Sequence, residues 1–148
     1  MKNVLVINGP NINLLGKREP SIYGSATYED LCKDLMRDAK EKNLSLEIFQ
    51  SNHEGEIVDK IQEASENTDL IIINAGAYTH TSVAIRDALA AVSIPIIEVH
   101  ISNIYKRENF RHHSYLSEIV SGIIAGFGTN SYFLALNAAS RMLSKSES

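Results

Sequence analysis

The chain has 148 residues, of which 44% are hydrophobic and 22% charged, and its formal net charge at pH 7 is −4. This length and composition predict one globular domain with a buried core. The acidic balance argues against nucleic acid as a partner, because nucleic-acid-binding domains usually carry a basic face. No run of 18 apolar residues could form a transmembrane helix, and the single cysteine cannot form an internal disulfide, so we expect a cytoplasmic protein with no membrane partner.

The first predicted strand, Lys2–Asn8, is followed by a long connection with the sequence GPNINLLGKREPSIYG (residues 9–24). A strand-to-helix connection in an α/β protein normally needs only about 2–6 residues. This one carries several amides, a lysine, an arginine and a tyrosine. Its length and its residue types indicate a role beyond joining two elements.

The next elements alternate between helices and strands. Thr27-Tyr28-Glu29-Asp30 has the capping-box pattern that begins a helix, and apolar residues follow it at intervals of four. Two further helices are predicted from the apolar stripes around residues 57–64 and 85–92. The strands between and after these helices are Leu44–Phe49, Asp69–Asn74, Pro95–Val99 and Ile119–Ala125. A last helix is predicted from a cap at Thr129-Asn130-Ser131 to about Leu143.

This alternation predicts an α/β fold, a flavodoxin-like three-layer sandwich in which helices cover both faces of a five-stranded parallel sheet. The second strand alternates apolar and polar residues, as an edge strand does, whereas residues 70–73 and 94–97 are continuously apolar. With the second strand at an edge, we expect the strand order 2-1-3-4-5.

Polar residues gather after three of the predicted strands. Asn8 ends the first strand, Asn74 and His80 follow the third, and Glu98 and His100 end the fourth. In the expected order these strands are neighbours, and ligands of open parallel sheets bind beyond the carboxyl ends of the strands. The positive charge is also local, at Lys17-Arg18, Lys106-Arg107 and Arg111, which favours a small anionic ligand over a polyanion.

Four candidate residues have both a catalytic or binding interpretation and a simpler one. Glu98 and His100 share one face of a strand, so the carboxylate can fix the imidazole tautomer and favour its charged form, although a merely structural pair is the alternative. Tyr23 could act as a base only if its pKa, normally about 10, were lowered by nearby arginines, and loop packing is the alternative. His80 precedes a helix start that suits a carboxylate, or Thr79 or Thr81 simply caps that helix.

Other classes of protein fit less well. His112-His113 lacks metal-ligand spacing, so we expect no metal. A flavin-binding module would need a Ser/Thr/Gly-rich phosphate loop after the first strand, where this chain has Pro10-Asn11-Ile12-Asn13. A phosphoacceptor receiver domain would need acidic residues where Asn8 and Asn74 end their strands.

Three segments together resemble the type II 3-dehydroquinate dehydratases, from about Val4 to about Leu143: NGPNINLLGKREPSIYG, NAGAYTHTSVAIRDAL and EVHISNIYKRENFRHHSYLS. The resemblance implies a single catalytic domain over residues 1–148 with a lid at about residues 16–24. It also implies dehydration of 3-dehydroquinate to 3-dehydroshikimate through an enolate, with no cofactor. The expected role is aromatic amino-acid biosynthesis through the shikimate pathway, with quinate breakdown as the alternative.

The resemblance also implies roles for individual residues. Tyr23 matches the base, Arg18 the arginine that lowers the pKa of the tyrosine, and Asn11 the amide that holds a water against the enolate oxygen. His100, oriented by Glu98, matches the acid that protonates the leaving hydroxyl. The residues that match substrate-binding positions are Asn74, His80, Asp87, Ile101, Ser102, Arg107 and Arg111. Asp87 is expected to reach a neighbouring subunit, because the family typically forms dodecamers of four trimers.

Overall fold

The structure is a computed structural model that describes residues 1–17 and 26–147. Its sheet has five parallel strands in the order β2-β1-β3-β4-β5, which confirms the predicted topology. The strands are β1 (Lys2–Asn8), β2 (Leu44–Gln50), β3 (Leu70–Asn74), β4 (Ile96–His100) and β5 (Gly122–Ala125). The α-helices are α2 (Tyr28–Glu41), α3 (Glu54–Ala64), α4 (Val83–Ala91) and α5 (Asn130–Glu147), and none of those described is long and apolar enough to cross a membrane.

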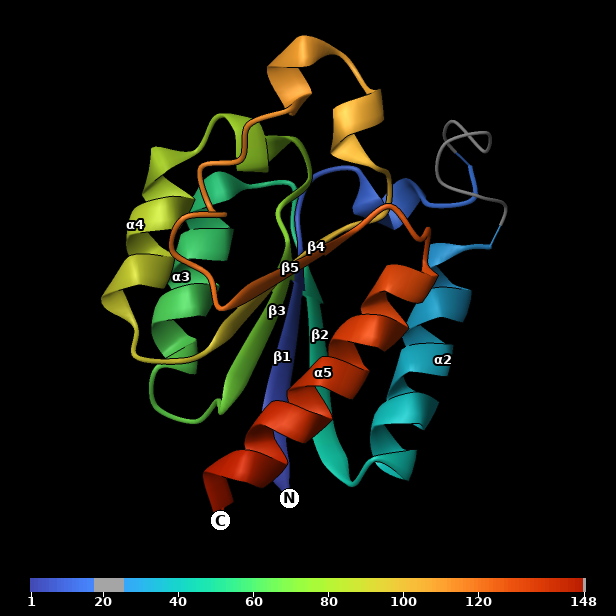
Figure 1. Ribbon diagram of the computed structural model, residues 1–148, viewed down its shortest axis with the longest axis vertical. Helices are drawn as coiled ribbons and strands as arrows, with labels where there is room; N and C mark the ends of the chain where they lie inside the picture. Colours follow the sequence, from blue (N-terminus) through green and yellow to red (C-terminus); the bar gives the residue numbers. More distant parts are fainter. Residues whose placement is uncertain (18–25, 148) are drawn as a thin grey trace.

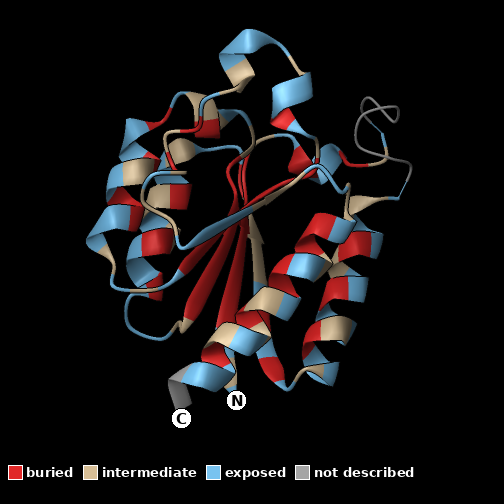
Figure 2. Ribbon diagram, in the orientation of Figure 1, coloured by how far each residue is buried: buried red, intermediate tan, exposed pale blue. Residues whose placement is uncertain are grey.

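The helices form two layers, with α2 and α5 on one face of the sheet and α3 and α4 on the other (Figure 1). Side chains along each central strand alternate between these layers. In β1, for example, Val4 and Val6 join the core under α2 and α5, whereas Leu5 and Ile7 join the core under α3 and α4. Figure 2 shows the result, a sheet whose central strands are buried and helices whose outer faces are exposed.

Local sequence accounts for where these helices begin. The side chain of Thr27 accepts a hydrogen bond of 3.1 Å from the backbone N–H of Asp30, so the expected cap at the start of α2 is present. The Ser82 hydroxyl caps α4 in the same way, accepting from the N–H of Ile85. The last helix begins at Asn130, inside the predicted cap.

The fifth strand is shorter than the prediction of Ile119–Ala125, because β5 begins only at Gly122. In the observed register Gly122 lies opposite Ile97 of β4, so Val120 would lie opposite Pro95, ahead of the first residue of β4. Proline has no N–H to donate to a ladder. Ile119 and Val120 pack against the core from a turn instead.

The carboxyl ends of the strands meet at one edge of the sheet, and the four short 3₁₀ helices of the described residues lie there (Figure 1). These are η1 (Ile12–Leu14), η2 (Gly76–His80), η3 (Ile104–Lys106) and η4 (Asn109–Arg111), and the two chain termini lie at the opposite end. The residues expected to bind a ligand or to take part in a reaction therefore lie at a single edge of the sheet.

A close backbone contact holds the loops after β1 and β3 together at this edge. The N–H of Gly9 donates a hydrogen bond of 2.8 Å to the carbonyl of Asn74. A Cβ atom at Gly9 would lie 2.2 Å from the carbonyl oxygen of Ala75, which is backbone and cannot rotate away. Only glycine allows these two loops to approach so closely.

We predict that Gly9→Ala lowers the free energy of unfolding by about 1–3 kcal/mol or more, because the added methyl group must push the two loops apart. Gly55→Ala is the matched control, since a Cβ there meets nothing within 4 Å and the residue lies in α3. An alanine in a helix is favoured over glycine by roughly 0.5–1 kcal/mol, so this control is expected to be neutral or stabilising. Urea unfolding of both variants measures the difference, and equal stabilities would contradict the role of the close contact.

Candidate active site

A cavity opens at the carboxyl ends of β1, β3 and β4, the position at which we expect a ligand site from the sequence. Its walls come from the loop after β1, from η2, from the end of β4 and from the segment through η3 and η4. The lining residues are Pro10, Asn11, Ile12, Asn74, Gly76, Ala77, His80, His100, Ile101, Ser102, Ile104, Arg107 and Arg111.

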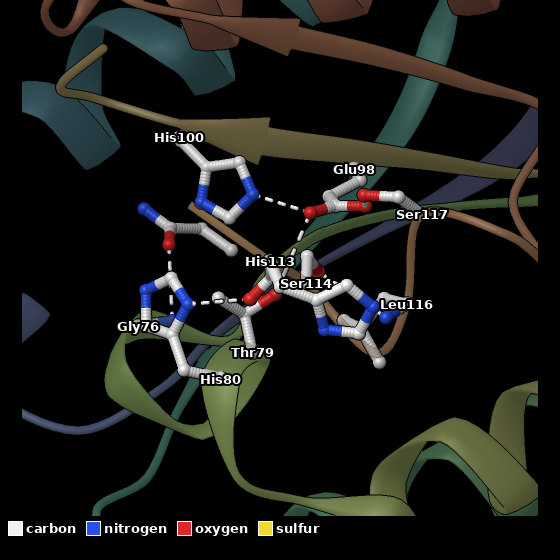
Figure 3. Close-up of polar contacts among 10 residues, drawn as sticks. Gly76, Thr79, His80, Glu98, His100, His113, Ser114, Leu116 and Ser117 are labelled. Carbon is white, nitrogen blue, oxygen red and sulfur yellow. Dashed lines mark hydrogen bonds and ion pairs between the residues drawn. The ribbon is translucent and has the colours of Figure 1, made fainter. Parts of the chain in front are cut away.

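The innermost polar feature is the expected contact between Glu98 and His100. Glu98 is fully buried and His100 nearly so, and the Nε2–H of His100 donates to Oε2 of Glu98 (Figure 3). Because a carboxylate only accepts hydrogen bonds, this contact places a proton on Nε2. The other ring nitrogen, Nδ1, does not contact Glu98. The carboxylate therefore sets the tautomer and the orientation of the imidazole.

Hydroxyl groups surround the other side of the Glu98 carboxylate. The Ser117 hydroxyl donates to Oε1 at 2.8 Å, and the Thr79 hydroxyl lies 3.5 Å from Oε2 (Figure 3). Burial by itself would raise the pKa of Glu98, but hydrogen bonds from His100, Ser117 and Ser114 and the charge of His100 outweigh it and hold the pKa below its usual value. The carboxylate is therefore ionised at neutral pH although it is buried.

His80 lies across from this pair, at the end of η2. Its Nδ1 lies 2.8 Å from the carbonyl oxygen of His113 and must donate to it, which leaves Nε2 as the acceptor of the neutral ring (Figure 3). Burial lowers the pKa of His80, and the charges of His100 and Arg111 lower it further, against the hydrogen bond to His113 and the charge of Glu98. At neutral pH, His80 is thus an uncharged hydrogen-bonding group on the wall of the cavity.

Asn11 adopts a left-handed backbone conformation, with a φ of 69°. Asparagine is one of the few residues that tolerate this conformation. The N–H of Asn11 donates a hydrogen bond of 3.0 Å to Oδ1 of Asn52, and the Tyr78 hydroxyl in turn donates to the carbonyl of Asn52. The loop after β2 therefore holds the turn that presents the Asn11 amide to the cavity.

Asn74, the last residue of β3, is 3% exposed and lines the cavity. Its Oδ1 accepts from the N–H of Gly76 at 3.1 Å, and its Nδ2 donates to the hydroxyl of Tyr132 at 2.9 Å. The orientation of its amide is consequently determined by the protein rather than by a ligand. Ile101 and Ser102, which directly follow β4, complete this wall of the cavity.

Two arginines cover the cavity from the segment after β4. The Nε–H of Arg111 donates to Glu108 at 3.2 Å, and its guanidinium lies 4.9 Å from the centre of the Phe110 ring. The carbonyl of Arg107 accepts a hydrogen bond of 2.9 Å from Nε2 of His112. Both arginines line the cavity together with His80 and Ser102, so two cations are available there to an anionic ligand.

The structure brings most of the predicted site residues together. The exception among the described residues is Asp87, which lies on the exposed surface of α4 and is not among the residues that line the cavity. Arg18 and Tyr23 lie outside the described residues, as does most of the expected lid at residues 16–24.

Sequence reasoning missed the residues that support the site from behind. Thr79, Ser114 and Ser117 surround Glu98, and Asn52 holds Asn11. Thr79 was considered only as a possible helix cap, and the other three residues were not singled out. Ser114 and Ser117 do lie within the third motif, so they could have been proposed as partners of a buried carboxylate. Asn52 carries no comparable sequence signal, because its role depends on two loops that meet only in the fold.

The chain was compared with known families and structures. The family model described as "Dehydroquinase class II" matches residues 2–140. A protein of Prochlorococcus marinus strain MIT 9301 named 3-dehydroquinate dehydratase is 62% identical over 136 residues, which cover 92% of this chain and 92% of that protein. One of the same name from Bordetella avium strain 197N is 60% identical over 141 residues, with 95% and 98% covered.

A solved structure agrees with these sequence relatives. The crystal structure of type II dehydroquinase from Butyrivibrio crossotus DSM 2876 matches with a TM-score of 0.91 at 55% identity, and the match covers 93% of this chain and 96% of that one. The sequence and the fold thus agree over nearly the whole length. The chain belongs to the class II dehydroquinase family.

Proposed function

We propose that the protein is a hydro-lyase that dehydrates 3-dehydroquinate to 3-dehydroshikimate and water. The observation that carries this proposal is the cavity at the carboxyl ends of three neighbouring strands, where a buried Glu98–His100 pair faces amides, His80 and two arginines in a chain of the class II dehydroquinase family. The shikimate pathway and aromatic amino-acid biosynthesis are the proposed role, in the cytoplasm, and quinate breakdown is the alternative.

The reaction requires three groups. A base must take the proton from the carbon beside the ketone, a donor must stabilise the enolate oxygen, and an acid must give a proton to the leaving hydroxyl. The electron pair of the broken C–H bond then forms the carbon–carbon double bond as the hydroxyl departs as water. The proposal assigns no step to a metal or to a cofactor.

His100 is proposed as the acid. Its Nε2–H is held by the ionised carboxylate of Glu98, so a charged ring would carry its second proton on Nδ1, the nitrogen that does not contact Glu98. The fixed ring orientation reduces the entropy that the transfer must overcome.

Tyr23 is proposed as the base and Arg18 as the cation that lowers its pKa, on the basis of the sequence resemblance alone, since both lie outside the described residues. Residues 1–148 are proposed to act as one catalytic domain with a lid at about residues 16–24. Asn11 is proposed to hold a water against the enolate oxygen, a role consistent with its place on the cavity wall and its supported backbone turn.

The substrate is proposed to bind through its carboxylate and hydroxyl groups to the remaining wall of the cavity. Asn74, His80, Ile101 and Ser102 are the proposed contacts of the carboxylate region, with Arg107 and Arg111 beside them. Because Nδ1 of the neutral His80 donates to the carbonyl of His113, its Nε2 is left to accept a hydrogen bond from a hydroxyl group of the ligand.

A homo-oligomer is also proposed, as a dodecamer of four trimers. Its support is the exposed edge of the sheet, where Ile123 of β5 is 51% exposed and Phe127 is 63% exposed. An unpaired apolar edge strand is normally covered in a native assembly. In such an assembly Asp87 is proposed to reach the site of a neighbouring subunit, which agrees with its exposed position on α4.

The main test mixes the purified protein with 3-dehydroquinate and follows enone formation by ultraviolet absorbance. We expect turnover by the wild type. Tyr23→Phe and His100→Ala should each lose several orders of magnitude in kcat, because removal of a general acid or base costs about 10²–10⁴-fold or more. No turnover by the intact wild type would overturn the assignment. Near-normal turnover by either variant would transfer its role to another residue.

The stability that Glu98 contributes to the fold depends on pH. The pKa of Glu98 is lower in the folded protein than its ordinary value, which applies to the unfolded chain. At a pH above the ordinary pKa, the ionised carboxylate therefore stabilises the fold. This stabilisation is lost as the pH falls through the lowered pKa of the folded protein. Glu98→Gln is therefore expected to lower the free energy of unfolding at neutral pH by about 1–3 kcal/mol. The difference in unfolding free energy between the wild type and Glu98→Gln should narrow as the pH falls below 4.5, the ordinary pKa of a glutamate.

Urea unfolding at several pH values measures this gap. Glu29→Gln is the control, because the Glu29 side chain is 80% exposed and its substitution should have little effect at any pH. A gap between the wild type and Glu98→Gln that stayed constant over the acidic range would show that the Glu98 charge does not contribute to stability.

The oligomer is tested by the mass of the protein in solution. We expect sedimentation equilibrium to give a multiple of the 16.4 kDa chain, and Ile123→Lys to reduce that multiple by placing a charge on the exposed edge. A wild type that sediments as a monomer would refute the proposed assembly.

A further inference from the structure

We propose that Tyr132 is a positioning residue for substrate binding, because its hydroxyl fixes the orientation of the Asn74 amide on the cavity wall. Tyr132 lies in the first turn of α5, behind the cavity, and is fully buried. It does not line the cavity, so it acts through Asn74 rather than by contact with a ligand. The inference rests on the proposed function, in which Asn74 binds the substrate.

The hydroxyl of Tyr132 joins the last residues of two neighbouring strands. Asn8 of β1 and Asn74 of β3 are paired in the sheet, and both side chains point toward the layer of α2 and α5. Tyr132 donates to Oδ1 of Asn8 at 2.6 Å and accepts from Nδ2 of Asn74 at 2.9 Å. At the far end, Nδ2 of Asn8 donates to the hydroxyl of Tyr28 at 3.2 Å.

One backbone group determines the donor and the acceptor in the hydrogen bonds that link Gly76, Asn74, Tyr132 and Asn8. The N–H of Gly76 can only donate, so the atom of Asn74 that faces it must be the acceptor Oδ1. Nδ2 of Asn74 must then face Tyr132, whose hydroxyl accepts there and gives its single proton to Asn8. One N–H of Asn74 is thereby committed to Tyr132, and the other is the donor that this amide can offer to a ligand.

Burial makes this arrangement exclusive. Asn8 is 0% and Asn74 3% exposed, so water is a poor substitute for a missing partner. Burial also raises the pKa of Tyr132 well above its ordinary value, and the phenol keeps the proton that it donates to Asn8 over the working pH range. If the Asn74 amide were rotated, its NH₂ group would face the N–H of Gly76. Two donors would then meet with no acceptor between them, so this orientation is disfavoured.

Removal of the Tyr132 hydroxyl would remove this restraint. In Tyr132→Phe the ring still fills the core, but Nδ2 of Asn74 loses its partner. The bond from the Gly76 N–H is then the one remaining hydrogen bond of those described that orients this amide, so its NH₂ group can shift toward other acceptors. If Asn74 binds the substrate equally in the ground state and in the transition state, the loss should appear in KM and not in kcat. A purely structural role for Tyr132 would lower stability and leave KM unchanged.

The test compares Tyr132→Phe with the control Tyr28→Phe in the 3-dehydroquinate assay. Tyr28→Phe removes the hydroxyl at the other end of the same chain of hydrogen bonds without touching a partner of Asn74. We expect KM to rise roughly tenfold in Tyr132→Phe, with kcat within about twofold of the wild type. In Tyr28→Phe both constants should stay within about twofold, although both variants should unfold more easily. Equal KM values in the two variants would overturn the proposal.

A double-mutant cycle with Asn74→Ala shows whether Tyr132 acts through Asn74. In the Asn74→Ala background, Tyr132→Phe should change KM no further, and additive effects would contradict the mechanism. If Tyr132→Phe does not fold, Asn8→Ala provides the same test, because it removes the acceptor that holds the Tyr132 proton away from Asn74. A wild type without any turnover would refute the proposed function, whereas an active wild type with an unchanged KM in Tyr132→Phe would refute this inference alone.

Discussion

Parallel pairing places the last residues of β1, β3 and β4 at a common edge, with Asn8 opposite Asn74 and Glu98 opposite Ile73. Side chains alternate between the two faces of a strand, so this edge divides its polar groups between the two helical layers. Asn8 and Asn74 point toward α2 and α5, and Glu98 points toward the layer of α3 and α4, with His100 on the same face. The position of each group in the site follows from its place in this register.

These polar groups are buried, and each has hydrogen-bond partners on its own face of the sheet. Tyr132 and Tyr28 satisfy the two asparagines on one side, whereas Thr79, Ser114 and Ser117 surround the carboxylate on the other. Unpaired, such groups would cost roughly 1–3 kcal/mol each, and more for the charge of Glu98. The contacts that offset the cost of burying these groups also orient the Asn74 amide and the His100 imidazole, which face the cavity. Stability and chemistry therefore depend on one set of hydrogen bonds.

Much of the fold could be predicted from the sequence, because periodicity reports burial directly. The continuous apolar run of residues 70–73 predicted a strand covered on both faces, and the alternation after Leu44 predicted the edge position of β2. The prediction was wrong where pairing, not hydrophobicity, decides the boundary. Ile119 and Val120 are apolar enough for a strand, but Pro95 cannot extend the ladder to meet them.

The sequence by itself determined the class of fold, the family and the residues gathered at the strand ends, because hydrophobic periodicity, residue parity and sequence motifs are all properties of short segments of the chain. The contact between Glu98 and His100 could be expected in the same way, because residues two positions apart on a strand lie on the same face. Only the tertiary structure decided which groups hold these residues in place. Asn52 meets Asn11 across 41 residues and Tyr132 meets Asn8 across 124, and contacts so distant in the chain exist only once the layers have packed.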